Sequence, residues 1–203
     1  MAAVEVRVFG NPINHGTRAQ RALAAKNNQN ADGKLDQVLL VLNQQQKAAA
    51  GRPNENVTFG RIYNATGGDL TYVTSFDWSG KVVGQYPMTI LNGQWAVFKH
   101  VGFRGSNHNS GSVAAVVYNI EDICESVIAW NNPPKRPGGG NNSAYCEMNE
   151  PGYVGDRNWV EIYQKLIASG TECQASMEGY TTKVSIDAEG NTPTFTALFY
   201  LDV

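Results

Sequence analysis

The chain has 203 residues, of which 42% are hydrophobic and 17% charged, a composition that can build one folded core and argues against general disorder. Its net charge of −2 leaves no excess of Lys and Arg for a phosphate backbone, so no nucleic-acid partner is expected. Residues 1–10 lack the apolar run of a secretory signal, and no stretch approaches the ~20 apolar residues of a membrane span. We therefore expect a cytoplasmic, or alternatively nuclear, protein without a signal peptide or transmembrane segment.

The N-terminal segment, residues 1–55, differs from the rest of the chain because Gln, Asn, Ala and Lys dominate it. Between Leu35 and Leu42, apolar residues recur at i, i+3, i+4 and i+7, which predicts a helix over 34–50. A shorter helix is expected over 17–26, with Thr17 as its N-cap. For residues 1–33 the sequence leaves two alternatives open, a mobile arm or a packed helix.

From Asn56 onward, short β-branched and aromatic runs alternate with turn residues every 8–12 positions, which is typical of a sandwich or barrel. We therefore expect one β-sandwich domain over 56–203. The first two of its strands are expected to pair as antiparallel neighbours, and the last two to form a closing hairpin. The expected strands are 57–64, 70–78, 82–86, 90, 94–101, 112–120, 125–130, 144–148, 180–187 and 194–202.

One late segment, 156–169, has helical rather than strand periodicity. Asp156 is the expected N-cap and Gly170 the expected stop. The apolar face, which should pack on a sheet, consists of Trp159, Ile162, Tyr163, Leu166 and Ile167. The Pro- and Gly-rich tract over 133–142 cannot form a central strand, so it is expected to be an exposed loop.

Motifs for catalysis or for binding a metal or nucleotide do not stand out. The three histidines, His15, His100 and His108, show neither HxH nor HExxH spacing. The chain also lacks a GxSxG motif for a serine nucleophile and a glycine-rich phosphate loop. We therefore predict a non-enzymatic protein without catalytic residues, metal or cofactor.

The three cysteines, Cys124, Cys146 and Cys173, cannot all pair within one chain, and none lies in a CxxC spacing. Free thiols are the expected state in a reducing compartment. The sequence leaves open whether one of them forms an intermolecular bond, and it leaves the oligomeric state open.

Five sequence blocks carry a family resemblance. From Tyr63 onward, the chain contains in order YNATGGDL, FDWSGKV, YPMTILNGQWAVFKHVG, GSVAAVVYNI and IAWNNP. Over about 56–203 these blocks resemble the plant 23-kDa jasmonate-induced protein family, which is associated with hormone and stress responses. The blocks are also more distantly similar to the actinoporin-like fold of pore-forming cytolysins, fungal fruit-body lectins and a fungal sphingolipid-binding protein. That resemblance implies a β-sandwich flanked by one helix before the first strand and one late in the chain.

The second resemblance also implies a ligand site at one end of the sandwich. In the cytolysins a phosphocholine headgroup is held by a Ser after the second strand, a Val in a GxVxxxxY strand, a polar-x-Pro element and aromatic residues of the late helix. Each matching position also has a structural interpretation, as a turn, a core residue, a strand exit or a packed helix face. The candidate ligand-binding residues are Ser79, Val113, Trp130, Asn131, Pro133, Trp159 and Tyr163.

Three hypotheses about function follow. The leading one is a stress-responsive binding module for a lipid headgroup or carbohydrate, with peripheral membrane contact. The second is a membrane-permeabilising defence protein, but the loop over 135–140 has no Trp or Tyr that could anchor in a membrane interface. The third is a protein-interaction or structural stress protein without a small-ligand site. Burial of both Trp159 and Tyr163 would favour the third.

Overall fold

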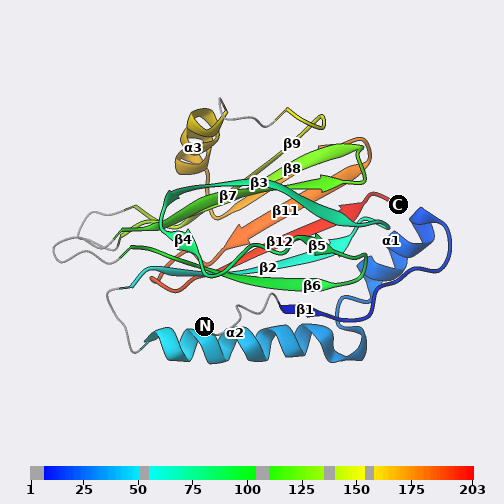
Figure 1. Ribbon diagram of the computed structural model, residues 1–203, viewed down its shortest axis with the longest axis horizontal. Coiled ribbons are helices and arrows are strands. Elements are labelled where there is room, and N and C mark those ends of the chain that lie inside the picture. Colours follow the sequence, from blue (N-terminus) through cyan, green and yellow to red (C-terminus); the bar gives the residue numbers. More distant parts are fainter. Residues whose placement is uncertain (1–6, 51–54, 104–109, 135–139, 154–157) are drawn as a thin grey trace.

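The computed structural model describes residues 7–50, 55–103, 110–134, 140–153 and 158–203. Two β-sheets are stacked face to face, and helices cover both outer faces and one end of the stack (Figure 1). The mainly β fold with a helix before the first long strand and another late in the chain is therefore confirmed.

The larger sheet is seven-stranded, with β2 (Val57–Ala65) between β6 (Trp95–Val101) and β12 (Thr194–Leu201). β2 runs antiparallel to β6 and parallel to β12. The other strands of this sheet are β1 (Arg7–Phe9) and β4 (Lys81–Val82), which pair with β6, and β11 (Tyr180–Ile186) and β10 (Glu172–Met177), which follow β12. The expected hairpin of the last two strands is confirmed, because β11 and β12 pair antiparallel.

The smaller sheet has five strands, and all of its pairings are antiparallel. A tight turn joins two of its central strands, and Glu121 and Asp122 there adopt positive φ values of 48° and 58°. The Asn119 side chain stabilises the turn by accepting a 2.7 Å hydrogen bond from the Asp122 backbone. In spatial order the strands are β5 (Thr89–Ile90), β3 (Leu70–Ser79), β7 (Ser112–Ile120), β8 (Cys124–Asn132) and β9 (Ser143–Asn149).

Two sequence-based strand predictions were wrong. β2 and β3 do not pair, because β6 and β12 occupy both edges of β2 while β5 and β7 flank β3. The chain crosses between the sheets after β2, where the Asn64 amide donates 2.7 Å hydrogen bonds to the carbonyls of Gly68 and Ile90. The strand expected over 82–86 is limited to β4, since Gly84 turns the backbone to φ +84°.

Two helices of the N-terminal segment pack against the sandwich. α1 (Arg18–Asn27) begins at Thr17, which forms the predicted N-cap as part of a capping box with Gln20. α2 (Lys34–Ala50) has the predicted bounds and covers the outer face of the larger sheet (Figure 1). Its buried residues Val38 and Leu42 belong to an apolar cluster with Phe59, Tyr63 and Trp95 of that sheet.

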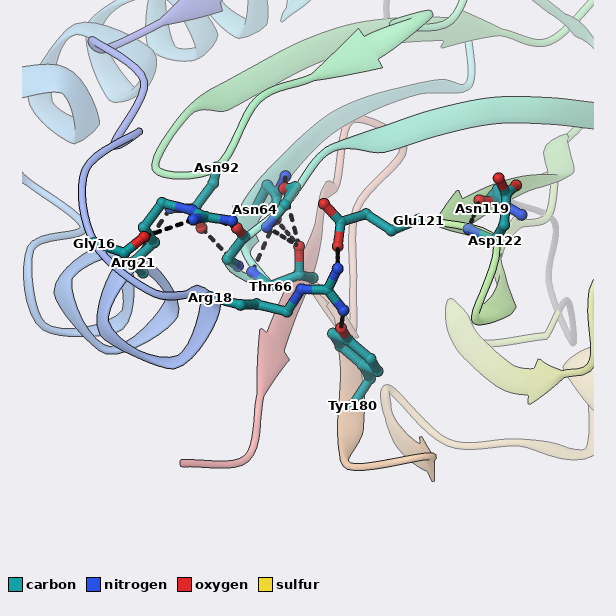
Figure 2. Close-up of polar contacts among 12 residues, drawn as sticks. Gly16, Arg18, Arg21, Asn64, Thr66, Asn92, Asn119, Glu121, Asp122 and Tyr180 are labelled. Carbon is teal, nitrogen blue, oxygen red and sulfur yellow. Dashed lines mark hydrogen bonds and ion pairs between the residues drawn. The ribbon is translucent and has the colours of Figure 1, made fainter.

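Side-chain hydrogen bonds fasten α1 to the end of the sandwich (Figure 2). Arg21 donates from Nε to the Gly67 carbonyl and from Nη1 to the Gly16 carbonyl, both at 2.8 Å. Arg18 forms an ion pair with Glu121 and donates a 3.0 Å hydrogen bond to the Tyr180 hydroxyl. Of the two alternatives for the region before residue 34, the described part therefore forms the packed one.

The late helix, α3 (Trp159–Ala168), lies on the outer face of the smaller sheet (Figure 1). It buries Trp159, Ile162 and Leu166 against alternate residues of the central strands, among them Val113 and Ala129. The helix begins after Asn158, whose side chain makes no capping hydrogen bond. The predicted N-cap, Asp156, lies outside the described residues.

Candidate ligand-binding site

Three of the predicted site residues lie in one row across the smaller sheet. Ser79 at the end of β3 is paired with Val113 on β7, and Val113 is paired with Asn131 on β8. Directly paired residues of neighbouring strands project to the same face of a sheet. Because Val113 packs with Trp159, this face is the outer one, which α3 covers. The row continues to Ser143 on β9, whose hydroxyl is 3.4 Å from the Asn131 amide nitrogen.

Aromatic side chains from β3 and α3 meet beside this row. The ring centroids of Trp78 and Tyr163 are 5.4 Å apart, and those of Phe76 and Trp159 are also 5.4 Å apart. Trp78 contacts Trp159 edge to face at 6.2 Å. Such centroid distances and tilts are typical of stabilising aromatic pairs. We call Phe76, Trp78, Trp159 and Tyr163 the aromatic cluster.

The members of the aromatic cluster differ in their exposure to solvent. Trp159 is only 5% exposed and anchors α3 to the sheet, whereas Phe76 is 40% and Tyr163 37% exposed. Trp78 is half-buried between them. The condition that would have favoured a purely structural role, burial of both Trp159 and Tyr163, is therefore not met.

A β-bulge shapes the strand that carries two of the rings. The register between β3 and β7 shifts between Asp77 and Ser79, so Trp78 is an extra residue opposite the regular ladder. The bulge lets Trp78 and Ser79 both lie on the side of α3, while Asp77 is hydrogen-bonded to Tyr86 and His100. Sequence reasoning missed Phe76 and Trp78, although their spacing of two residues in an expected strand places them on one face.

The structure does not bring Trp130 to this face, which corrects its placement beside a ligand. Successive residues of a strand point to opposite sides, so Trp130 faces inward when its neighbour Asn131 faces α3. It is fully buried between the two sheets, where its ring packs against Phe98 and Phe195. Its indole Nε1 lies 3.3 Å from the Ser112 hydroxyl.

Pro133 lies just beyond the end of β8 and is half-buried. The backbone of Gly111 approaches it so closely that a Cβ atom at this glycine would lie 3.2 Å from the Pro133 Cα. The end of β8 is therefore packed closely against the backbone of Gly111. The loop predicted to depart from the cytolysin pattern, 135–140, falls outside the described residues except for the exposed Gly140.

Charges beside the aromatic cluster are paired. The Glu147 carboxylate on β9 accepts hydrogen bonds from Tyr145 at 2.7 Å and Lys165 at 3.0 Å. Partial burial opposes ionisation of Glu147, but the hydrogen bonds from Tyr145, Lys165 and Asn149 outweigh it and lower the pKa of the carboxyl. Lys165 is also 2.8 Å from Glu161 one helical turn earlier, and hydrogen bonds to Glu161 and Glu147 raise its pKa. Its positive charge is thus largely compensated.

A serine, a histidine and an aspartate are in contact at the edge of the core, but they do not form an accessible active site. His100 Nδ1 lies 2.9 Å from the Ser112 hydroxyl, and His100 Nε2 lies 3.3 Å from Asp77 Oδ1. Ser112 and His100 are both fully buried, so a substrate has no access to the hydroxyl. Ser112 also donates to Thr58 at 2.7 Å, and the group therefore links β6, β7 and β2 across the core. Within the described residues, no three His, Cys, Asp or Glu side chains are grouped to hold a metal ion.

A separate hollow lies on the outer face of the larger sheet, beside α2. Its lining includes Arg61, Glu172 and Asp187, with Leu39 of α2 along one side. None of the predicted ligand-binding residues lines it. The described helices include none that is long and apolar enough to cross a membrane.

The fold and the site define a class of protein: a helix-flanked β-sandwich with half-exposed aromatic rings between its late helix and the adjoining sheet. The chain belongs to the Nakanori-like protein family, whose model matches residues 7–201. It is 36% identical over 139 residues to the 23 kDa jasmonate-induced protein of Hordeum vulgare, a match that covers 64% of this chain and 63% of that protein. The chain thus spans less than two thirds of that relative. A crystal structure of the lipid binding protein Nakanori is similar in fold, with a TM-score of 0.81 and 21% identity, covering 96% of this chain and all of the other.

Proposed function

We propose that the protein is a non-catalytic binding module that holds a lipid headgroup carrying a quaternary ammonium and a phosphate, such as phosphocholine. The observation that carries this proposal is the aromatic cluster, in which Phe76, Trp78 and Tyr163 retain exposed ring surface beside Ser79 and Asn131. The description of the similar solved structure as a lipid binding protein supports the same ligand class.

The chemistry of the surface suits a zwitterionic headgroup. A quaternary ammonium is attracted by the negative faces of aromatic rings and needs no hydrogen-bond acceptor. The rings of Trp78 and Tyr163 pack against each other with a tilt of 42°, so a cation can rest on the exposed surface that both rings contribute. The Ser79 hydroxyl and the Asn131 amide can donate hydrogen bonds to a neighbouring phosphate. A carbohydrate, the other ligand class considered, would stack more favourably on a flat ring platform.

The outer side of α3 supports a peripheral contact with the membrane that presents the headgroup. Val160, Tyr163 and Ile167 follow at i, i+3 and i+7 and are 69%, 37% and 52% exposed. Apolar side chains in such a stripe gain free energy by entering the headgroup region. The stripe continues the aromatic cluster through Tyr163, so one approach of the protein to a membrane can engage both.

Vesicle pelleting tests the proposal. We expect the protein to sediment with sphingomyelin or phosphatidylcholine vesicles and not with phosphatidylglycerol vesicles of equal size. Tyr163→Ala should reduce sedimentation, whereas Tyr153→Ala, which removes a 57% exposed tyrosine outside the aromatic cluster, should not. Binding to a glycan array without binding to any vesicle would contradict the lipid proposal and favour a lectin.

Membrane permeabilisation is not part of the proposal. The helix that precedes the sandwich, α2, is packed on the larger sheet through Val38 and Leu42, and its first residue, Lys34, donates a 2.7 Å hydrogen bond to the Gly93 carbonyl. We expect no release of trapped dye from vesicles that bind the protein.

The name of the barley relative supports placing the module in a jasmonate response, which transcript measurements after jasmonate treatment would test.

A further inference from the structure

Two cysteines from different sheets meet at the seam where the edges of the sandwich come together. Cys146 belongs to β9 and Cys173 to β10, the edge strands of the smaller and larger sheets, which lie side by side. Cys146 is 3% exposed, and Cys173 is half-buried against the same core cluster. The Cys173 thiol donates a 3.3 Å hydrogen bond to the Cys146 carbonyl oxygen, and the Cys146 thiol donates a 3.5 Å hydrogen bond to the Thr182 carbonyl oxygen. The Cys173 sulfur therefore touches the residue that carries the second thiol, on the neighbouring edge strand.

The environment makes the two thiols chemically unequal. Hydrogen bonding by the Cys146 side chain lowers the pKa of Cys173 to about 6, which favours the thiolate of Cys173 over that of Cys146. The same hydrogen bond, together with burial, raises the pKa of Cys146. Cys124 has no comparable activation, because burial raises its pKa to about 11. A partly exposed thiolate beside a second thiol has the features of an oxidation-sensitive pair.

We propose that Cys146 and Cys173 are a redox modification site, at which a hydroperoxide forms a disulfide that joins the two sheets. The Cys173 thiolate attacks the terminal oxygen of the hydroperoxide, the O–O bond breaks, and sulfenic acid forms with release of an alcohol or, from hydrogen peroxide, water. Cys146 then attacks the Cys173 sulfur, loses its proton and expels the hydroxyl group as water. The two thiols lose two electrons, which reduce the hydroperoxide, and a dithiol reductant reverses the bond.

One cysteine of the pair lies on a strand that also supports the candidate site. The proposed disulfide does not require a bound ligand. Cys146 lies between Tyr145 and Glu147 on β9, and Lys165 of α3 binds Glu147. A disulfide would hold β9 against β10. It would therefore restrict the movement of the strand that contacts α3 through Glu147. Because Cys146 faces the core and its two neighbours face α3, the bond would form without occupying the ligand surface.

Peptide mapping by mass spectrometry tests the proposal on the full chain treated with hydrogen peroxide. We expect the intact mass to fall by two hydrogen atoms, a cross-linked peptide pair containing Cys146 and Cys173, and recovery of both free thiols after dithiothreitol. Cys124→Ser should still form the bond. Cys173→Ser and Cys146→Ala should each abolish it, and thermal unfolding of each variant checks that it is folded.

A second measurement separates an activated pair from two thiols that are merely close. At neutral pH, Cys173 should react with hydrogen peroxide faster in the unaltered chain than in Cys146→Ala, because the variant lacks the hydrogen bond that stabilises the thiolate. In that variant a sulfenic acid should be trapped on Cys173 by dimedone. Over-oxidation of Cys173 without a cross-link in the unaltered chain would overturn the proposal, as would a bond that involves Cys124 or a second chain.

Discussion

The ring of Trp78 on β3 meets the ring of Tyr163 on α3 at a centroid distance of 5.4 Å. This contact joins a strand and a helix that are far apart in the sequence, and it leaves part of both side chains exposed. The site therefore depends on the docking of α3, which Trp159, Ile162 and Leu166 provide from its buried side. Ligand contacts and helix packing can be separated because different residues of the same helix carry them.

Removal of the exposed ring should weaken ligand binding without unfolding the protein. Tyr163→Ala is expected to lower affinity for phosphocholine vesicles by about twofold to thirtyfold, because one cation–π contact contributes about 0.5–2 kcal/mol. The thermal midpoint should change little, since Tyr163 is more than one-third exposed. Vesicle titration and differential scanning calorimetry measure the two effects. Unchanged affinity in this variant would remove the aromatic cluster from the binding surface.

Truncation on the buried side of α3 should act primarily on stability. Ile162 is 1% exposed and packs in the cluster that contains Val117 and Val127. Ile162→Ala is expected to reduce the free energy of unfolding by about 2–4 kcal/mol, through lost burial and a residual cavity. Ile167→Ala, on the 52% exposed side of the same helix, is the matched control and should cost well under 1 kcal/mol. Urea unfolding followed by tryptophan fluorescence distinguishes them.

The elements that the sequence predicted well are those with a strong local pattern. The apolar spacing of α2 placed its bounds correctly, and β7 matches the expected Ser112–Ile120 run of small and β-branched residues. β10 was missed because Glu172–Met177 contains no β-branched or aromatic residue, so its strand propensity is weak although its polar and apolar residues alternate. β1 was missed because only three residues of it pair with β6.

The assignment of strands to sheets was beyond local patterns, because it depends on contacts between distant segments. Both neighbours of β2, β6 and β12, come later in the chain, and only the fold shows that β12 lies beside β2 in parallel. The candidate site has the same origin. The row from Ser79 to Asn131 requires the registers of three strands, and the inward direction of Trp130 follows only once those registers are known.

Acid should weaken the interactions beneath α3 through Glu147. Its pKa is lowered in the folded protein, so its contribution to stability is fully present above the ordinary carboxyl value of about 4.3 and is lost as the pH falls through the lower folded value. Glu147→Gln should therefore reduce stability at pH 7 and flatten the decline of stability in acid. Urea unfolding of both proteins between pH 7 and acid measures the difference. A parallel decline would show that other carboxyls are responsible.

The fastening of α1 can be tested by hydrogen exchange. Arg21→Ala removes two 2.8 Å hydrogen bonds, to the Gly67 and Gly16 carbonyls, and should lower the protection of α1 amides by roughly tenfold to a hundredfold, since such bonds from a charged group contribute about 1.5–3 kcal/mol. Amides of β7, at the centre of the smaller sheet, should keep their protection. Lys47→Ala, at an exposed position of α2, is the control. Equal loss of protection in α1 and β7 would indicate global destabilisation instead.

Close approach of the backbone at Gly67 provides a final test of the same contact between α1 and the sandwich. Gly67 has φ +83°, and a Cβ atom there would collide with the backbone carbonyl of Arg18. Gly190 has nearly the same conformation, φ +87°, but no heavy atom lies within 4 Å of its Cβ position. Alanine is strained at both sites by the positive φ, so any additional loss at Gly67 comes from the collision. We expect Gly67→Ala to reduce the free energy of unfolding by about 1–3 kcal/mol more than Gly190→Ala. Equal thermal midpoints for the two variants would mean that α1 moves away at little cost.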